Sequence, residues 1–572
     1  MGKRAGIALG IVVCLGMAAG SPVYAKKKKA EPASHLFQKE IPKQERIQQA
    51  LNRLTFGPRP GDAARVKATG LKKWIDLELH PDRIPENPVL AEKLKALDSL
   101  AMTSQQLVAN YPPPQLIRQM LKGKVAFPAD PDRRMMVEKV VERFERRQKQ
   151  NGAPTDPQQE LAALLTPEQI RALRNGPAGQ RLAAFEALPP ETQNDVLATA
   201  PGMLQPVFAI APPELRRKLE MAAGPQQVVA RDLSEGKLLR AIYSNRQLEE
   251  VLTDFWFNHF NVYLDKGADH WLVTSYERDV IRPHVLGKFR DLLEATAQSP
   301  AMLFYLDNWQ SVGANSPQGR NARRGLNENY GRELMELHTL GVDGGYTQKD
   351  VIEVARCFTG WTIERPQLGG KFVFNPKMHD QGEKIVLGVK IPAGGGIEDG
   401  ERVLDILARH PSTAHFISRK LAQRFVADDP PASLVNRMAD TFLKTDGDLR
   451  AVLKTMLDSR EFWSEGAYRT KMKSPLEMVA SAVRASGGDV DFAAALVNQV
   501  AVLGEPLYRK EEPTGYSNSS AQWMNSAGLL ARMNFALNLA ANRVPGVKVE
   551  TAEAAGGPAP GISLGSPEFQ RH

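Results

Sequence analysis

The hydrophobic positions of this chain follow a helical period along most of its length. The clearest example lies in the middle of the sequence, where Tyr330, Leu334 and Leu337 recur at intervals of four and three residues and form one apolar stripe. Asn327 stands where an N-cap would, and Gly341 stands where a left-handed residue commonly ends a helix. This pattern predicts one helix from about Asn327 to Gly341.

A second helix and a short β element are predicted directly after the first helix. Thr347, with Asp350 three residues later, has the spacing of a capping box. The apolar runs WTI, KFVF and KIVLG then follow within about 361–390, separated by residues typical of turns. His379 and Asp380 fall in the HDQG turn of this element.

We therefore expect a mainly α fold: a multi-helix globular body with a small β element after the central helical hairpin. The composition of successive segments suggests five parts. They are a signal peptide (1–25), an N-terminal helical part of the main domain (26–124), a helical insertion or spacer (125–235), the main helical domain (236–545), and a flexible loop with a short terminal helix (546–572).

A weak internal repeat marks the predicted insertion. Similar Pro-Glu segments start 23 residues apart, at Pro167, Pro190 and Pro213, and each is followed about ten residues later by Pro or Gly. This spacing is typical of a run of short helical hairpins. The alternative is that Pro-Glu simply begins several unrelated helices.

The N-terminus has the three regions of a secretory signal peptide. Lys3 and Arg4 precede an apolar run, and Val23-Tyr24-Ala25 places small residues before the cut, so the mature chain is expected to begin at Lys26. A membrane anchor is the alternative, because the apolar run is near the lower length limit for a span. With the signal peptide removed we expect no transmembrane anchor and a periplasmic, outer-surface or secreted protein.

The net charge and the cysteine count limit which partners and which covalent cross-links are expected. The formal charge is +9, but two positive charges leave with the signal peptide and four more lie at Lys26 to Lys29, which leaves +3 for the body. A nearly balanced body does not call for nucleic acid as a partner. Cys357 is the only cysteine of the mature chain, so no intramolecular disulfide can form, and its apolar surroundings favour a buried side chain over a nucleophile.

Charged residues on the central helix form a candidate site. Glu328, Arg332 and Glu336 are spaced four apart and predict an ion-pair ladder, with Glu333 next to Arg332. Upstream, His259 falls on an apolar helical stripe, which favours a hydrogen-bonded structural histidine over a ligand. The candidate binding residues are Asn258, Asn327, Arg332 and Trp361.

Consecutive elements usually pack together, so the HDQG turn is expected to fold back over the central helix. This predicts one cleft lined by His259, Glu333, Glu336, His379 and Asp380. Within it the candidate catalytic residues are Glu333, Glu336 and Asp380, and the candidate metal ligands are His259, Glu333, Glu336 and His379. These residue types suit a divalent metal as the cofactor.

The chain also resembles a known family along nearly its whole mature length. The motifs are LNRLTFGPRPGD, FWFNHFNVY, NENYGRELMELHTLGVDGGYTQKDV, ARCFTGWTI, HDQGEKIVLG, HPSTAHFISRKLAQRFV, KSPLEMV, GEPLY with PTGY, and SPEFQRH. Together they are similar to the exported bacterial family "domain of unknown function 1800". The resemblance implies a mostly helical exported protein. It also implies a partner, an exported protein of the domain of unknown function 1501 family, which resembles alkaline phosphatases and sulfatases.

Two classes of function remain open from the sequence. The first is a non-catalytic scaffold or binding protein of the cell envelope that works with the phosphatase- or sulfatase-like partner. The absence of a nucleophile motif, a phosphate loop and an HExxH signature supports it. The second is a metal-dependent hydrolase that acts on an envelope or extracellular polymer.

Overall fold

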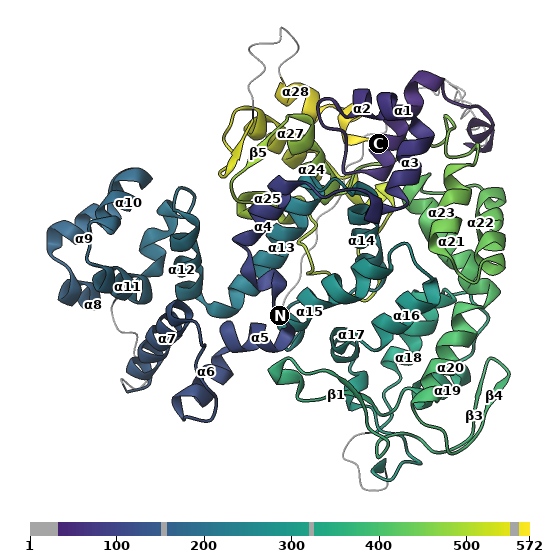
Figure 1. Ribbon diagram of the computed structural model, residues 1–572, viewed down its shortest axis with the longest axis horizontal. Coiled ribbons are helices and arrows are strands. Elements are labelled where there is room, and N and C mark those ends of the chain that lie inside the picture. The colour runs from purple at the N-terminus through teal and green to yellow at the C-terminus, as the bar shows by residue number, and fades with distance from the viewer. Residues whose placement is uncertain (1–32, 150–156, 320–324, 550–559) are drawn as a thin grey trace, which may run out of the picture.

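The architecture is predominantly helical, as a computed structural model describes it for residues 33–149, 157–319, 325–549 and 560–572 (Figure 1). The mainly α fold predicted from the hydrophobic pattern is confirmed. Strands in these residues form three two-stranded antiparallel sheets. The predicted signal peptide, residues 1–25, lies outside the described residues. None of the described helices is long and apolar enough to cross a membrane.

The main body buries one continuous hydrophobic core, to which helices from both ends of the chain contribute. Its helices are α1 (Arg46–Leu54), α2 (Asp62–Thr69), α3 (Leu71–Glu78), α4 (Pro88–Lys95), α13 (Pro225–Tyr243), α14 (Gln247–His259), α15 (Asp269–Ser275), α16 (Phe289–Ala297), α17 (Pro300–Tyr305), α18 (Asn329–Glu333), α19 (Gln348–Cys357), α20 (Ile397–Ala408), α21 (Pro411–Phe425), α22 (Ala432–Lys444), α23 (Leu449–Leu457), α24 (Pro475–Ala485), α25 (Ala494–Val502), α26 (Ser520–Trp523), α27 (Ser526–Ala540), α28 (Pro560–Gly565) and α29 (Pro567–Gln570).

A second, smaller core lies in a helical lobe that extends to one side of the body (Figure 1). Its helices are α5 (Ser104–Asn110), α6 (Pro114–Leu121), α7 (Pro131–Lys149), α8 (Pro157–Leu164), α9 (Pro167–Arg174), α10 (Ala178–Glu186), α11 (Pro190–Thr199) and α12 (Pro213–Ala223). The three prolines of the 23-residue spacing are the first residues of α9, α11 and α12. Between successive prolines the chain therefore forms two helical segments: α9 and α10 before Pro190, and α11 and a 3₁₀ helix (Pro201–Val207) before Pro213.

The central hairpin differs from the predicted pair of regular helices. After α18 the backbone changes to a π-helix at η10 (Leu334–Thr339), and Gly341 then adopts a φ of +84°. Asn327 caps the helix as predicted, because its Oδ1 accepts a hydrogen bond from the backbone N–H of Asn329 at 2.9 Å. Glu328, which precedes the first residue of α18, already has helical backbone angles and makes no capping bond with its side chain. The capping box of Thr347 and Asp350 is confirmed at α19.

The small β element predicted at about 361–390 is confirmed as two hairpins. β1 (Trp361–Ile363) pairs with β2 (Phe372–Phe374), and β3 (Lys384–Val386) pairs with β4 (Val389–Ile391). Each hairpin has its own turn, and the HDQG residues lie between β2 and β3, in the segment that connects the two hairpins.

The C-terminal part of the chain returns to the main body. β5 (Asp489–Val490) pairs with β6 (Val547–Lys548), a sheet that the sequence did not predict. Residues 550–559, part of the expected loop, lie outside the described residues. The predicted short terminal helix is confirmed as α29, and Arg571 beyond it forms a β-bridge with Met472. This docking brings the end of the described chain next to the start of α24.

Candidate functional site

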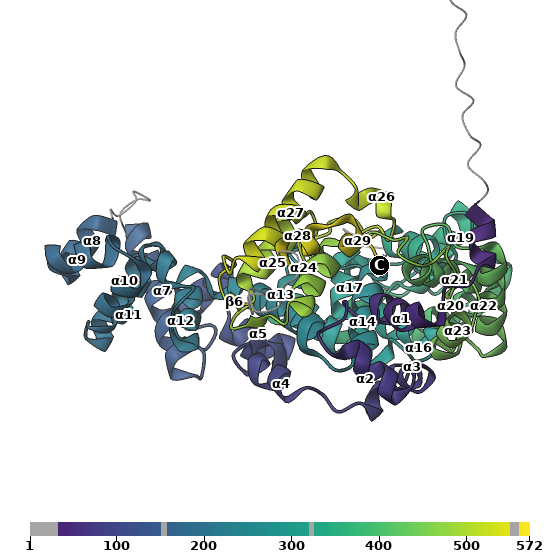
Figure 2. The same cartoon turned by 90° about the horizontal axis from the view of Figure 1, so that it is seen from above.

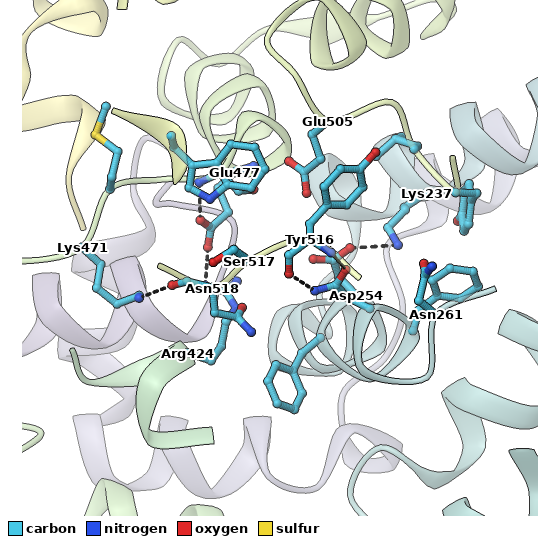
Figure 3. A pocket seen from close by; sticks show the side chains of 18 residues that line it. Lys237, Asp254, Asn261, Arg424, Lys471, Glu477, Glu505, Tyr516, Ser517 and Asn518 are labelled. Atoms are coloured by element: carbon cyan, nitrogen blue, oxygen red, sulfur yellow. Dashed lines mark hydrogen bonds and ion pairs between the residues drawn. The ribbon is translucent and has the colours of Figure 1, made fainter. Parts of the chain in front are cut away.

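A cavity of about 60 Å³ lies where α13, α14, α21 and α24 meet the chain between α25 and α27 (Figure 3). A space of this size accommodates small polar groups or one or two water molecules. Its wall is unusual because most of the lining side chains are charged, amide or aromatic. They include Lys237, Asp254, Asn258, Asn261, Arg424, Lys471, Glu477, Glu505, Tyr508, Tyr516, Asn518 and Trp523.

One side of the cavity is built around the buried ammonium of Lys237. Its Nζ lies 2.9 Å from Asp254 Oδ1 and 3.6 Å from Glu277 Oε2. The hydroxyl of Tyr508 donates to Glu277 Oε2 at 2.6 Å. Burial by itself lowers the pKa of Lys237, but the two carboxylates outweigh it and the pKa is raised. Lys237 is therefore charged at neutral pH.

Glu505 is the carboxyl of the cavity that forms no close ion pair within the described residues, although the charges of Lys237 and Arg532 act on it from farther away. Its Oε2 accepts a hydrogen bond from the backbone N–H of Leu476 at 2.8 Å. Burial raises the pKa of Glu505 to about 8, and the neighbouring charge of Asp254 adds to the shift. Glu505 consequently holds a proton at neutral pH and presents a neutral hydrogen-bond donor, in the same cavity as the Lys237–Asp254 ion pair.

The opposite side of the cavity carries two cation–carboxylate pairs. Arg424 Nη1 lies 2.5 Å from Glu477 Oε1, and both side chains are buried. Lys471 Nζ lies 2.5 Å from Asp428 Oδ1 and donates to the backbone oxygen of Asn518 at 2.6 Å. Burial lowers the pKa of Lys471 to about 8. The ammonium thus ties the loop of Asn518 to the chain that precedes α24.

Two amides, Asn258 near the end of α14 and Asn261 just after it, hold the loop that closes the cavity. Asn258 Nδ2 donates to the backbone oxygen of Tyr516, and the N–H of Tyr516 donates to Asn258 Oδ1, both at 2.6 Å. Asn261 Nδ2 donates to the backbone oxygens of Lys510 and Glu512, at 2.9 and 3.0 Å. This loop, residues 505–518, is hereafter called the strap.

A glycine in the strap allows this close approach. Gly515 has a φ of +68°, and a Cβ at this position would lie 2.1 Å from the backbone oxygen of Asn258. No other residue type fits both the backbone conformation and the space. The strap and α14 therefore form one closely packed unit at the cavity wall.

The charged residues predicted on the central helix lie mostly at the surface. Arg332 Nη2 is 3.4 Å from Glu328 Oε2, and both side chains are well exposed. Glu336 instead accepts a hydrogen bond from the Tyr346 hydroxyl at 3.4 Å, because the π-helix changes the register of the ladder. The predicted three-residue ladder is thus wrong in its second half. Glu333 is half-buried, and burial together with Glu336 raises its pKa.

His379 and Asp380 are bound into a separate network between the two hairpins and α19. His379 Nδ1 lies 2.7 Å from the backbone oxygen of Thr359, and its Nε2 lies 3.1 Å from Asp399 Oδ2. Burial tends to raise the pKa of Asp380, but a 2.8 Å bond from Arg356 helps to outweigh it and the pKa is lowered. Both residues have hydrogen-bond partners that explain their burial.

His259 and Trp361 are also core residues. His259 Nε2 lies 3.1 Å from the backbone oxygen of His338, and burial lowers its pKa well below the usual value. This placement agrees with the structural role favoured for His259. Trp361 is fully buried, so its indole is not accessible to a ligand. Cys357 is buried as predicted, and burial raises the pKa of its thiol.

The candidate metal ligands do not gather into one cluster. In the part of the chain that the structure describes, no group of three His, Cys, Asp or Glu side chains could hold a metal ion. His259 lies in the core beside His338, Glu333 and Glu336 lie on the central helix, and His379 and Asp380 belong to the hairpin network. The predicted common cleft therefore has no metal-binding arrangement among these residues.

Sequence reasoning identified one residue of the cavity, Asn258, and missed the others. The sequence motifs that carry the family resemblance could have indicated the other cavity residues. FWFNHFNVY supplies Asn258 and Asn261, KSPLEMV supplies Glu477, GEPLY supplies Glu505, and PTGY supplies Tyr516. These motifs are short, and FWFNHFNVY lies far along the chain from the other three, so their convergence is visible only in the folded chain.

Comparison with known proteins gives one match. The model of a family described as "Protein of unknown function (DUF1800)" matches residues 49–562. The matched stretch contains every residue named above as lining the cavity. No curated protein and no solved structure matches the chain.

Proposed function

The chain belongs to the DUF1800 family, and we propose that it is an exported binding protein of the cell envelope whose strap-covered cavity holds a polar group of an envelope polymer. Export is supported by the arrangement of residues 1–25, in which a basic start, an apolar run and small residues succeed one another. The working partner proposed for it is the phosphatase- or sulfatase-like exported protein of the DUF1501 family, which would act on the same polymer.

Glu505 is the observation that carries this proposal. A buried carboxyl without a cation costs stability, because it loses water without gaining an ion pair. Such groups concentrate at functional sites. As a neutral acid, Glu505 can donate a hydrogen bond to a hydroxyl, ether or carbonyl oxygen of a ligand.

The rest of the wall suits a ligand rich in such oxygens. Tyr516 and Trp523 offer aromatic rings, and the Lys237–Asp254 pair offers a donor and an acceptor side by side. Aromatic faces and paired polar groups are the usual means of binding sugar-like surfaces. We therefore favour a polysaccharide of the envelope as the ligand.

The test is a binding measurement with the purified mature protein and isolated envelope polysaccharide, by isothermal titration calorimetry. Glu505→Gln keeps a neutral donor and is expected to retain binding, whereas Glu505→Ala is expected to weaken it by about tenfold, the loss of one buried hydrogen bond. Glu92→Ala, at an exposed position, is the matched control. Equal affinity of the wild-type and Glu505→Ala proteins would contradict the proposal.

A second candidate function follows from the pairing of Glu505 with Asp254. A protonated carboxyl and an ion-paired carboxylate are the two types of group that metal-free hydrolysis of a glycosidic bond uses, and the strap would have to open to admit the bond, because about 60 Å³ is too small for a sugar ring. Glu505 would give its proton to the leaving oxygen, while Asp254 would accept a proton from the attacking water. A metal-dependent hydrolase would need a cluster of metal ligands, and the described residues contain no group of three His, Cys, Asp or Glu side chains that could hold an ion.

The same variants separate binding from hydrolysis. Glu505→Gln cannot donate a proton, so it would abolish release of reducing ends while leaving calorimetric binding intact. If the wild-type protein binds polysaccharide but releases no reducing ends over long incubation, the binding function stands and the hydrolase reading is rejected.

A further inference from the structure

Helix α27 is apolar on two opposite sides, although the body of the protein covers only one of them. On the covered side Phe535, Ala536 and Leu539 are buried. α28 packs on this helix, where a Cβ at Gly565 would lie 3.7 Å from the Cβ of Ala536. Figure 2 shows α27 and α28 together along one edge of the molecule.

The uncovered side presents an apolar stripe to solvent, beside the exposed amides of Asn534 and Asn538. Its members are Leu529, Leu530, Met533 and Leu537, together with Met524 just before the helix, and their exposed fractions run from 37 to 60 %. Leu530, Met533 and Leu537 follow at intervals of three and four residues and so form one stripe along the helix. Single exposed apolar residues are ordinary on soluble proteins, but five on one short segment indicate an interaction surface.

The charges around this face identify the kind of surface that would cover it. Residues 513–549 contain no aspartate or glutamate, although the whole chain has 65 acidic residues. Their basic residues are Arg532, Arg543 and Lys548. Arg532 is buried and donates to the backbone oxygen of Lys473, whereas Arg543 and Lys548 are exposed after the end of the helix. The segment that carries the apolar face thus has no acidic residue and two exposed cations, of which Lys548 lies with its Nζ 3.8 Å from Asp491 Oδ2.

We propose that α27 docks the protein on an anionic phospholipid surface. Leu530, Met533 and Leu537 would enter the boundary between headgroups and acyl chains, and Arg543 and Lys548 would meet the headgroup phosphates. The helix is too short to span a bilayer and would lie in its plane, as an interfacial helix does.

This docking is independent of the ligand assigned to the cavity, but it would determine where the cavity works. Trp523 lines the cavity and ends α26, and α27 begins three residues later. A membrane-bound α27 would therefore keep the cavity within a short distance of the lipid surface.

The experiment is flotation of the mature protein with vesicles of phosphatidylcholine alone or mixed with phosphatidylglycerol. The wild-type protein is expected to float with the mixed vesicles and to bind less at high salt. The double variant Leu530→Asn/Met533→Asn is expected to lose binding by at least about tenfold, since two apolar side chains would no longer be buried. Arg543→Gln/Lys548→Gln should remove the preference for phosphatidylglycerol.

The matched control is Val342→Asn/Leu443→Asn, which changes two exposed apolar residues on other elements and is expected to float like the wild type. Circular dichroism melting would show that all variants fold. The proposal is overturned if the wild-type protein stays at the bottom of the gradient, or if it floats equally with both vesicle types. A dimer in light scattering that the Leu530 variant separates, without vesicle binding, would assign the face to a second copy.

Discussion

Asn258 and Tyr516 are joined by two hydrogen bonds that run in opposite directions between one side-chain amide and one peptide backbone. The amide thus pairs with the strap much as one strand pairs with another. An amide beside an apolar stripe needs a partner, and here that partner is the loop that closes the cavity. The relationship makes α14 the support on which the strap rests.

Removing this support should free the strap without unfolding the body. For Asn258→Ala we expect faster hydrogen exchange at residues 510–518 and a loss of roughly 1–3 kcal/mol of unfolding free energy, the cost of two unpaired peptide groups. Gly515→Ala should act alike, because the added Cβ meets Asn258. Asn538→Ala, which changes an exposed amide on α27, is the control. Unchanged exchange in the strap of Asn258→Ala would show that other contacts hold it.

The protonated Glu505 predicts a specific dependence of stability on pH. Because its pKa in the folded state is about 8, against 4.5 in the unfolded chain, only the folded state keeps this proton between these pH values. Stability from this group is therefore complete below pH 4.5 and is lost as the pH rises toward 8, by roughly 1.4 kcal/mol per unit at most.

This dependence is measured as a difference between proteins, because burial also raises the pKa of Glu78 to about 8. Between pH 6 and 8 the wild-type melting temperature should fall more than that of Glu505→Gln. The exposed variant Glu92→Gln should follow the wild type. Parallel curves for wild type and Glu505→Gln would mean that Glu505 is ionised in the folded protein.

Replacement of Arg332 and of Arg424 should change the unfolding free energy by very different amounts, although each arginine is paired with a glutamate. Arg332 and Glu328 are both solvent-exposed, so Arg332→Ala should cost about 0–1 kcal/mol. Arg424 and Glu477 are both buried, so Arg424→Ala should cost roughly 3–5 kcal/mol by leaving a buried carboxylate alone. Urea unfolding of the two variants measures both values. Similar midpoints for the two would refute the assignment of Arg424 to a buried pair.

Export is tested by the N-terminal sequence of the protein recovered from cells. We expect the mature chain to begin at Lys26 and to be found outside the cytoplasm. A cytosolic protein with residues 1–25 intact would reject export and, with it, the envelope setting of the proposed function.

Metal removal should have little effect. Since no described cluster of His, Cys, Asp or Glu residues could hold an ion, dialysis against a chelator is expected to leave the melting temperature and polysaccharide binding unchanged. Elemental analysis that finds one tightly bound transition metal per chain would contradict this expectation.

Local signals in the sequence determined much of the secondary structure. The capping box of Thr347 and Asp350 and the proline starts at Pro167, Pro190 and Pro213 were predictable. They depend on hydrogen bonds and backbone angles within a few residues. Burial of Cys357 was predictable because it follows from the periodicity of a single helix.

The cavity and the details of the central helix were decided by the tertiary structure alone. Glu505 is far along the chain from Asp254 and Lys237, which lie on consecutive helices, and nothing near it in the sequence indicates the other two. The π-helical turn that separates Glu336 from Arg332 departs from the regular spacing on which the ladder was predicted. A charged side chain acquires its role from the groups that surround it after burial. Those groups come from distant segments, because the free energy of burying a shared core brings the segments together.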